Sequence, residues 1–244
     1  MNQIISIAAC NAQPISKPEH RDADDHSVVV HSIFYTVQGE GPLSGHPAIF
    51  VRLSGCNLQC PQCDTEYTEK ALRMEPEAIV RDVAATHEHT QGPRLVVITG
   101  GEPFRQAIGM LCALLTDNGY QVQIETNGTL PPPSGLPLDT VVVVSPKTGK
   151  VHPDTAAVAN AYKYVLNGDS YDPADGLPIR ALGHTAHPRV ARPPEGFPLG
   201  AIYVQAADRK DPALNAYNER TALAACKKFG YTFQIQLHKY LNVE

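Results

Sequence analysis

Short apolar stretches recur along the chain, separated by turns that are rich in glycine and proline. Stretches of β-branched and aromatic residues between such turns predict β-strands. They lie at 27–38, 48–55, 94–100, 120–128, 138–147, 161–168, 200–208 and 231–241. The pattern therefore predicts seven or eight strands, the last of them in YTFQIQLHKYL near the end of the chain.

Three further segments carry apolar residues at helical spacing. MEPEAIVRDVAATHEHT has Pro76 in its first turn and Ile79, Val80 and Val83 on one side. FRQAIGMLCALLTDNG and NAYNERTALAACKKFG both end in glycine, which commonly terminates a helix. Because strands alternate with helices, we expect βα units around a mostly parallel sheet.

The number of predicted helices is too small for a closed barrel of eight βα units, which usually takes about 250 residues. With 244 residues, the chain is expected to form an α/β fold built as a partial, open TIM-like barrel. Residues 28–244 are expected to be a single domain, with a loop and room for a short helix at 167–198. Residues 1–27 are charged and without period, which predicts a disordered N-terminal extension.

Composition and charge exclude several classes of protein. The net charge is −5 and no block of Lys and Arg stands out, so we expect no nucleic-acid partner. No apolar run approaches the roughly 20 residues of a membrane-spanning helix, and the first residues lack the pattern of a signal peptide. The six cysteines lack the even spacing of a disulfide framework, which is typical of reduced thiols in a cytoplasmic protein.

Chemically suggestive residues follow five of the predicted strands. The segments are CNLQCPQC, TGGEP, ETNG, SPK and QAAD, each directly after a strand. In parallel α/β folds the carboxyl ends of the strands meet at one mouth, where ligands bind. We therefore expect these segments to converge on one active site.

The cysteines Cys56, Cys60 and Cys63 have the spacing C-x3-C-x2-C within one polar loop. Buried free thiols do not need this spacing. A structural zinc site needs a fourth protein ligand, for which His46 or a more distant residue is a candidate. A [4Fe–4S] cluster held by three thiolates leaves one iron open for a ligand that is not protein.

This motif resembles that of the radical S-adenosylmethionine superfamily, and Gly100–Pro103 (GGEP) resembles the glycine-rich strand end of the same superfamily. The resemblance implies that S-adenosylmethionine binds the open iron and is cleaved to a 5′-deoxyadenosyl radical. One departure is Gln62, because the superfamily often has an aromatic residue before the third cysteine.

A closer resemblance runs from about Ile33 to the end of the chain. The combination of QGEG, C-x3-C-x2-C-D-T, VITGGEP, IETNGT, VSPK and the terminal HK is similar to the 7-carboxy-7-deazaguanine synthase family. That family contracts 6-carboxy-5,6,7,8-tetrahydropterin to 7-carboxy-7-deazaguanine, releases ammonia and regenerates S-adenosylmethionine. The resemblance further implies Mg²⁺, a homodimer, a small-molecule pterin substrate and an electron donor such as flavodoxin.

The same resemblance implies a set of site residues. Thr65 would bind Mg²⁺, which prefers oxygen ligands. Substrate would be bound by Val37, Gln38, Gly39, Arg52, Thr99 and Glu244. S-adenosylmethionine would be bound by Gln62, Cys63, Asp64, Gly101, Ser145, Pro146, Lys147, Gln205, Ala206, Ala207 and Asp208. Ala206 stands where the family usually has proline.

Two alternative functions share part of this pattern. An activating enzyme that makes a glycyl radical on a partner protein would share the cysteine triplet and GGEP, but not a magnesium-binding threonine. A non-enzymatic iron–sulfur or zinc protein would share the cysteines, but it would need neither GGEP nor QGEG.

Overall fold

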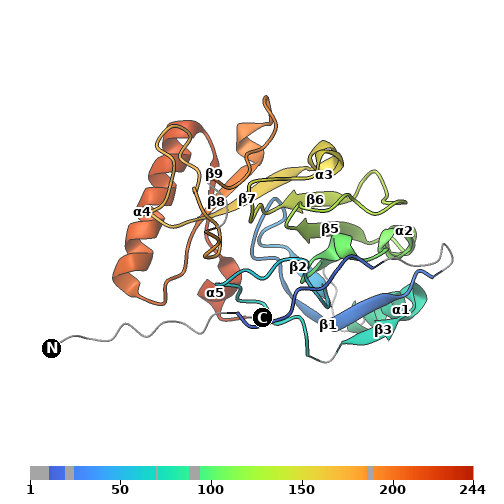
Figure 1. The fold of residues 1–244 in the computed structure, drawn as a ribbon. Coiled ribbons are helices and arrows are strands. Elements are labelled where there is room, and N and C mark those ends of the chain that lie inside the picture. Colours follow the sequence, from blue (N-terminus) through green and yellow to red (C-terminus); the bar gives the residue numbers. More distant parts are fainter. Residues whose placement is uncertain (1–10, 20–24, 70, 88–93, 186–188, 244) are drawn as a thin grey trace.

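The computed structural model describes residues 11–19, 25–69, 71–87, 94–185 and 189–243 (Figure 1). All nine strands of the described residues belong to one sheet, in the order β3-β1-β2-β4-β5-β6-β7-β8-β9. Their bounds are β1 Val28–Val37, β2 Pro47–Leu53, β3 Leu72–Met74, β4 Leu95–Gly100, β5 Gln121–Thr126, β6 Val141–Val144, β7 Ala161–Leu166, β8 Ile202–Ala206 and β9 Thr232–Gln234.

The sheet is mostly parallel and open. Strand β1 pairs antiparallel with both β2 and β3, whereas β2 and β4 through β9 pair parallel with one another in chain order. β3 and β9 are the two edges of the sheet and do not pair with each other. The predicted partial barrel with a mostly parallel sheet is therefore confirmed.

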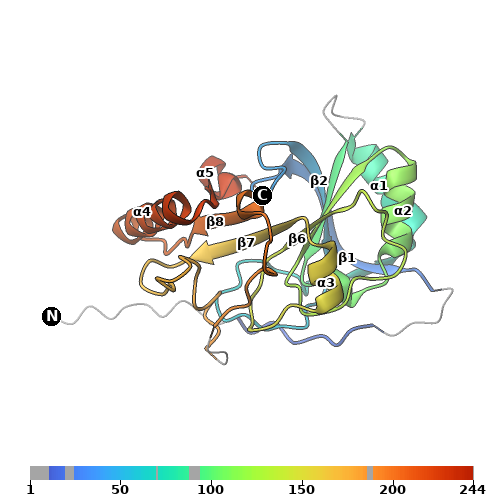
Figure 2. The ribbon, with the colours of Figure 1, turned by 90° about the horizontal axis from the view of Figure 1, so that it is seen from above.

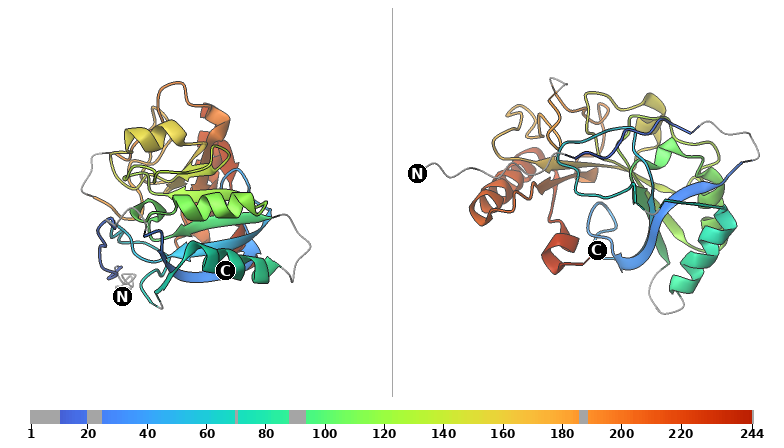
Figure 3. Two further views of the ribbon diagram at one scale, coloured as in Figure 1. Left: turned by 90° about the vertical axis from the view of Figure 1, so that its right-hand side faces the viewer. Right: turned by 60° about the horizontal axis from the view of Figure 1, so that its bottom comes forward.

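The helices cover the outer side of the curved sheet (Figures 2 and 3). α1 (Pro76–His87) and α2 (Gly109–Asp117) pack near β1, β2 and β5, while α3 (Pro153–Val158) packs on β6 and α4 (Pro212–Phe229) on β8 and β9. The short α5 (Leu237–Leu241) and the 3-10 turns η1 (Pro103–Arg105) and η2 (Leu199–Ala201) complete the described elements. Among the described residues, no helix combines the length and hydrophobicity needed to cross a membrane.

The two-residue period of the strands sorts their side chains between the two faces. One face is apolar: Ile49, Ile98, Ile124, Val144 and Val204 are all buried in the main core under the helices. Their strand neighbours face the other way, toward the inner side of the open barrel. That inner face carries a set of polar residues, namely Arg52, Thr99, Gln123, Glu125, Lys163 and Gln205.

Several element boundaries differ from those predicted. The helix expected over 104–119 begins only at Gly109, because Glu102 caps the separate turn η1 by accepting from the Phe104 N–H. The strand expected over 231–241 ends at Gln234 and gives way to α5. The sequence pattern missed β3 and α3, and the described part of 167–198 contains no helix.

Residues 11–19 lie within the segment for which the sequence predicts a disordered extension. They form no helix, but Ile15 makes an isolated parallel bridge with Cys56, and the Glu19 carboxylate pairs with Arg105 at 3.1 Å. This part of the segment thus lies against the cysteine loop, and the fold differs here from the expectation. The remaining residues of the predicted extension before position 25 are outside the described ranges.

Candidate active site

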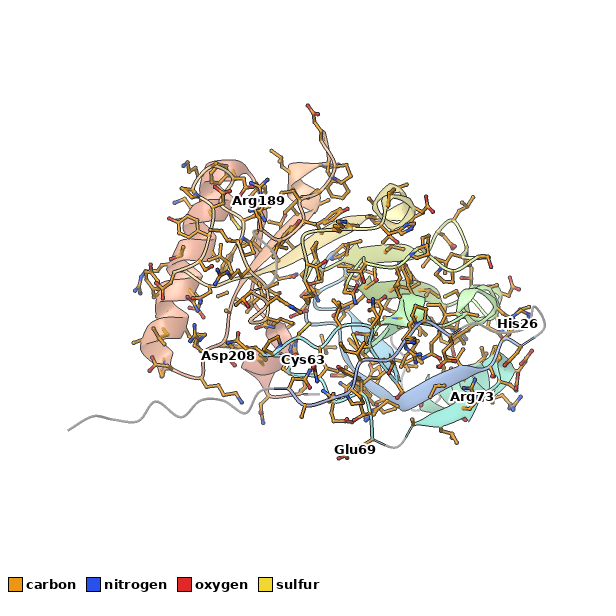
Figure 4. All side chains as sticks on the ribbon, viewed as in Figure 1. His26, Cys63, Glu69, Arg73, Arg189 and Asp208 are labelled. Atoms are coloured by element: carbon orange, nitrogen blue, oxygen red, sulfur yellow. The ribbon has the colours of Figure 1, made fainter. Side chains whose placement is uncertain are left out.

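The loop that carries the three cysteines follows β2 directly. The Gly55 N–H donates to the Tyr67 carbonyl at 3.0 Å, which joins the two ends of the loop. Within the loop, the Cys63 N–H donates to the Cys60 carbonyl at 3.1 Å. Cys56 and Cys60 are buried and Cys63 is half-buried. Figure 4 shows Cys63 on this loop, on the side of the molecule where α5 lies.

The surroundings of the thiols disfavour an isolated thiolate. Burial raises the pKa of Cys56 to about 12 and the pKa of Cys60 to about 11. Polar groups nevertheless reach both sulfur atoms: the Leu58 N–H lies 3.5 Å from Cys56 Sγ, and His184 Nε2 lies 3.1 Å from Cys60 Sγ. A buried site of this kind favours thiolates once a metal supplies positive charge.

The GGEP segment lies in direct contact with the start of the cysteine loop. The Gly101 N–H donates to the Leu53 carbonyl at 3.1 Å, and the Glu102 N–H donates to the Gly55 carbonyl at 3.0 Å. A Cβ atom on Gly101 would lie 2.0 Å from the Gly55 oxygen, so no larger residue fits. Glycine is required here for close approach of two backbones.

Glu102 connects this segment to the end of β5. Its fully buried carboxylate accepts from the Thr126 hydroxyl at 2.6 Å and from the Asn127 N–H at 2.7 Å, while burial raises its pKa. Asn127 Nδ2 in turn donates to Asn57 Oδ1 at 2.9 Å. The ETNG segment therefore supports the cysteine loop through Asn57, which the sequence pattern did not single out.

The SPK segment follows β6 with Ser145 and Pro146 buried. The Lys147 ammonium donates to the carbonyl and the hydroxyl of Ser145. Burial, followed by the charge of Lys163, lowers the pKa of Lys147. Lys147 is also close enough to Cys60 to favour the thiolate there, so its positive charge faces the cysteine loop.

The QGEG loop contributes polar side chains to the inner face of the sheet. Gln38 is buried and donates through Nε2 to Glu125 Oε1 at 3.0 Å. The Glu40 carboxylate accepts from Gln205 Nε2 at 2.7 Å and from Gln236 Nε2 at 2.9 Å. This loop is thus tied to β5, to β8 and to the segment between β9 and α5.

Lys163 lies at the centre of this network. Its buried ammonium pairs with Glu40 and with Glu125, the latter at 2.8 Å. Burial alone would raise the pKa of Glu40, but the Lys163 charge and hydrogen bonds hold it well below its usual value. Burial would lower the pKa of Lys163, yet the two carboxylates raise it. Glu40 and Lys163 are therefore both charged near neutral pH.

The terminal HK pair contacts both the cysteine loop and the QGEG loop. Lys239 pairs with Asp64 of the cysteine loop at 2.8 Å, and the Leu237 N–H donates to the Gly39 carbonyl at 3.2 Å. A Cβ atom on Gly39 would lie 2.4 Å from His238 Nδ1. Glu244, the predicted substrate contact at the chain end, lies outside the described residues.

The other predicted substrate residues lie on β1, β2 and β4. Arg52 and Thr99 are register neighbours on β2 and β4, and the Arg52 guanidinium lies 4.9 Å from the centre of the Phe34 ring. Val37 ends β1 directly before Gln38. The predicted residues of QGEG and the strand ends are thus brought together on one side of the sheet.

The QAAD segment is divided between the inner face of the sheet and the β8–α4 turn. Gln205 is buried beside Glu40, whereas the Ala207 N–H donates to the Leu166 carbonyl at 2.8 Å. Asp208 accepts from the Lys210 N–H at 2.8 Å and from Asn215 at 2.9 Å, which organises the start of α4. Gln62 is exposed, and its N–H donates to the Leu182 carbonyl at 3.0 Å.

The arrangement of the three cysteine thiols fits an iron–sulfur cluster better than a single metal ion. Within the described ranges, no three His, Cys, Asp or Glu side chains converge on one metal position. A cluster does not require such convergence, because each of its thiolates binds a different iron. For an organic ligand, the Oε1 atoms of Gln123 and Gln205 are buried acceptors without a hydrogen-bond partner among the described residues.

Comparison with known proteins agrees with this site. Residues 50–137 match the family model described as the Radical SAM superfamily. The chain is 39% identical over 230 residues to the 7-carboxy-7-deazaguanine synthase of Rhodospirillum rubrum, covering 90% of this chain and 94% of that protein. It is 36% identical to the synthase of Rickettsia prowazekii, covering 91% of each.

A solved structure has the same fold. The crystal structure of QueE from Escherichia coli aligns with a TM-score of 0.66 at 27% identity, over 88% of this chain and 96% of that chain. Fold, cysteine loop and GGEP contact thus define an enzyme of the radical S-adenosylmethionine class. Within that class, the chain belongs to the 7-carboxy-7-deazaguanine synthase family.

Proposed function

We propose that the enzyme converts 6-carboxy-5,6,7,8-tetrahydropterin to 7-carboxy-7-deazaguanine with loss of ammonia. The observation that carries this proposal is the network of polar side chains on the inner face of the sheet, beside the QGEG loop. This polar wall presents two carboxamides, two carboxylates and a lysine on the strands and on the QGEG loop. A pterin ring displays donors and acceptors around its edge and matches such a wall.

The cluster and S-adenosylmethionine would occupy the strand ends. Cys56, Cys60 and Cys63 would hold a [4Fe–4S] cluster, and the bound pair supplies a 5′-deoxyadenosyl radical. The close contact of Gly101 with Gly55 puts the main chain of GGEP beside the cysteine loop, where the methionine moiety would bind. The rest of the cofactor would be bordered by Gln62, Asp64, Ser145, Pro146, Lys147 and Gln205 to Asp208. Its regeneration after each turnover is part of the proposal.

Residues of the inner face of the sheet and of the QGEG loop would position the substrate. Arg52, on the inner face, would bind the substrate carboxylate through its planar fork of donors. Val37, Gln38, Gly39 and Thr99 would bound the ring, and Glu244 would close over it. The unpartnered Oε1 atoms of Gln123 and Gln205 support a ligand that donates hydrogen bonds to this wall.

Mg²⁺ would bind the Thr65 hydroxyl. The Thr65 carbonyl is already held by Gln13 Nε2 at 2.9 Å, so the residue is fixed in place through its main chain. Mg²⁺ prefers oxygen ligands and retains water or substrate oxygens around a single protein hydroxyl. We further assign the enzyme to the cytoplasm, as a homodimer reduced by an electron donor such as flavodoxin, with no nucleic-acid or membrane partner.

The test is anaerobic turnover by the reconstituted, reduced enzyme with substrate and Mg²⁺. S-adenosylmethionine is supplied at a lower concentration than the substrate. We expect more 7-carboxy-7-deazaguanine than S-adenosylmethionine supplied, and none from Cys60→Ala. Formation of 5′-deoxyadenosine without the product would overturn the substrate assignment. Absence of both from an intact reduced cluster would favour an iron–sulfur carrier.

A further inference from the structure

Residues 11–19, here called the N-terminal strap, run along the outside of the cysteine loop. The Asn11 N–H donates to the Pro61 carbonyl and Asn11 Nδ2 donates to the Cys60 carbonyl, both at 3.1 Å. At the other end of the loop, the Ser16 N–H donates to the Cys56 carbonyl at 2.7 Å. The strap therefore holds the main chain of two cluster ligands.

Gln13 holds the segment after the third cysteine. Its amide donates through Nε2 to the Thr65 carbonyl and accepts through Oε1 from the Tyr67 N–H, both at 2.9 Å. Gln59 Nε2 donates back to the Gln13 carbonyl at 2.8 Å. One side chain thus fixes the residue that would bind Mg²⁺, and the loop holds the strap in return.

Arg105 anchors the far end of the strap. Its buried guanidinium pairs with Glu19 at 3.1 Å and donates to the Lys17 and Ser54 carbonyls, each at 2.9 Å. Arg105 lies in η1, directly after GGEP. The strap is therefore attached both to the cysteine loop and to the segment that contacts S-adenosylmethionine in the proposed function.

We propose that the N-terminal strap is a positioning element of the cofactor site. Asn11 fixes the Cys60–Pro61 main chain, and Gln13 fixes Thr65. The loop between Cys56 and Tyr67 has few hydrogen bonds of its own, so ordering its backbone depends on external partners. Among the described residues, the strap side chains hydrogen-bond to main-chain atoms of the loop and not to its thiols, which separates this role from ligation.

The Gln13→Glu substitution separates the two bonds of the amide. A carboxylate still accepts from the Tyr67 N–H, but it cannot donate to the Thr65 carbonyl. Gln13→Ala removes both bonds. Lys17→Ala is the matched control, because the Lys17 side chain is exposed and the strap uses only its carbonyl.

The first measurement is the rate at which a chelator removes iron from the reconstituted full-length enzyme. Loss of one or two loop hydrogen bonds predicts about tenfold faster iron loss for Asn11→Ala and for Gln13→Ala, with Lys17→Ala unchanged. Circular dichroism establishes whether each variant is folded. Folded variants that lose iron at the wild-type rate would overturn the proposal.

A second measurement addresses Thr65 and rests on the proposed function. Gln13→Glu is expected to raise the Mg²⁺ concentration for half-maximal turnover about fivefold, with turnover recovered at saturating Mg²⁺. A general loss of stability would lower the maximal rate without this shift. If the wild-type enzyme makes no deazaguanine, the proposed function fails, and the iron-loss rates still decide the role of the strap.

Discussion

At the scale of single residues, the site depends on two backbones approaching more closely than any side chain allows. Gly101 lies against Gly55 and Cys56, the residues that begin the cysteine loop. These short distances explain why glycine is the last residue of β4 and also the residue directly after it. Gly55 and Gly101 thus help to determine the position of Cys56, and they need no contact with iron to do so.

Gly101→Ala is therefore expected to separate GGEP from the cysteine loop. The new Cβ atom would lie 2.0 Å from the Gly55 oxygen and 2.9 Å from the Cys56 nitrogen, so the backbone must move. We expect S-adenosylmethionine affinity to fall by roughly 100-fold, since two main-chain hydrogen bonds are lost. Equilibrium binding to the reconstituted enzyme measures this. Gly200→Ala is the control, because Gly200 is exposed, has open space around its Cβ and does not have a positive φ.

His184 contacts Cys60, and the sequence pattern did not indicate this contact. With Nε2 protonated, the imidazole donates to Cys60 Sγ across 3.1 Å. Hydrogen bonds to cluster sulfur atoms stabilise the reduced, more negative state and raise the reduction potential. His184→Leu should lower the potential by about 40 mV, equivalent to roughly 1 kcal/mol for one electron.

Redox titration followed by electron paramagnetic resonance measures that potential. His46→Leu serves as the control, because the exposed His46 ring bonds to the Leu43 carbonyl in the loop before β2 and not to a cysteine of the described residues. An unchanged potential in His184→Leu, or an equal change in His46→Leu, would show that the imidazole does not influence the cluster.

At the scale of elements, β7 contributes the charge that joins the QGEG loop to β5. Lys163→Met would leave Glu40 and Glu125 as buried carboxylates without their shared cation. Removal of one partner from such a pair typically costs about 3–5 kcal/mol of stability. Urea unfolding followed by circular dichroism measures this loss, since the chain has no tryptophan. Lys227→Met, on the exposed side of α4, should change stability little.

Sequence pattern predicted most elements because their apolar residues have a clear period. It could not reveal Lys163, because a lysine within AYKYVL gives no sign of carboxylates that are distant in the chain. It also extended the last strand to Leu241. Gln234 and Gln236 bond to Gly41 and Glu40, and these tertiary contacts turn the chain away after β9.

The same reasoning applies to the candidate site. The five strand-end segments were predictable because the carboxyl ends of parallel strands converge, and QGEG was recognisable as a motif. The supporting contacts of Asn57, His184 and the N-terminal strap were not, because a polar residue in a loop has many possible partners. The hydrogen-bond partner of such a residue can be identified only when the fold of the sheet shows which loops are neighbours.

At the scale of the whole molecule, the charged network joins the two ends of the sheet. Glu40 follows the antiparallel strand β1, Glu125 belongs to β5 and Lys163 to β7, while Gln236 lies beyond the edge strand β9. The network therefore links the QGEG loop, which follows β1, to the segment between β9 and α5. The stability of the fold should therefore depend on the ionisation of this network.

The pH dependence has a definite sign. Glu40 has a folded-state pKa below its ordinary value of 4.5, so its contribution to stability is present above about pH 4.5 and is lost as pH falls toward the folded-state pKa. Lys163 has a raised pKa, so its contribution is present below its ordinary value of 10.5 and is lost only in strong alkali. Near neutral pH both contributions are complete.

We therefore expect Glu40→Gln to be less stable than the wild-type protein at about pH 7, and the difference to shrink as pH falls below about 4.5. Urea unfolding at a series of pH values between about 7 and 3 measures the difference. Glu219→Gln, on the exposed face of α4, is the control and should track the wild-type curve. A Glu40→Gln difference that stays constant across this range would mean that the carboxylate charge does not stabilise the fold, and that Glu40 acts only through hydrogen bonds that glutamine retains.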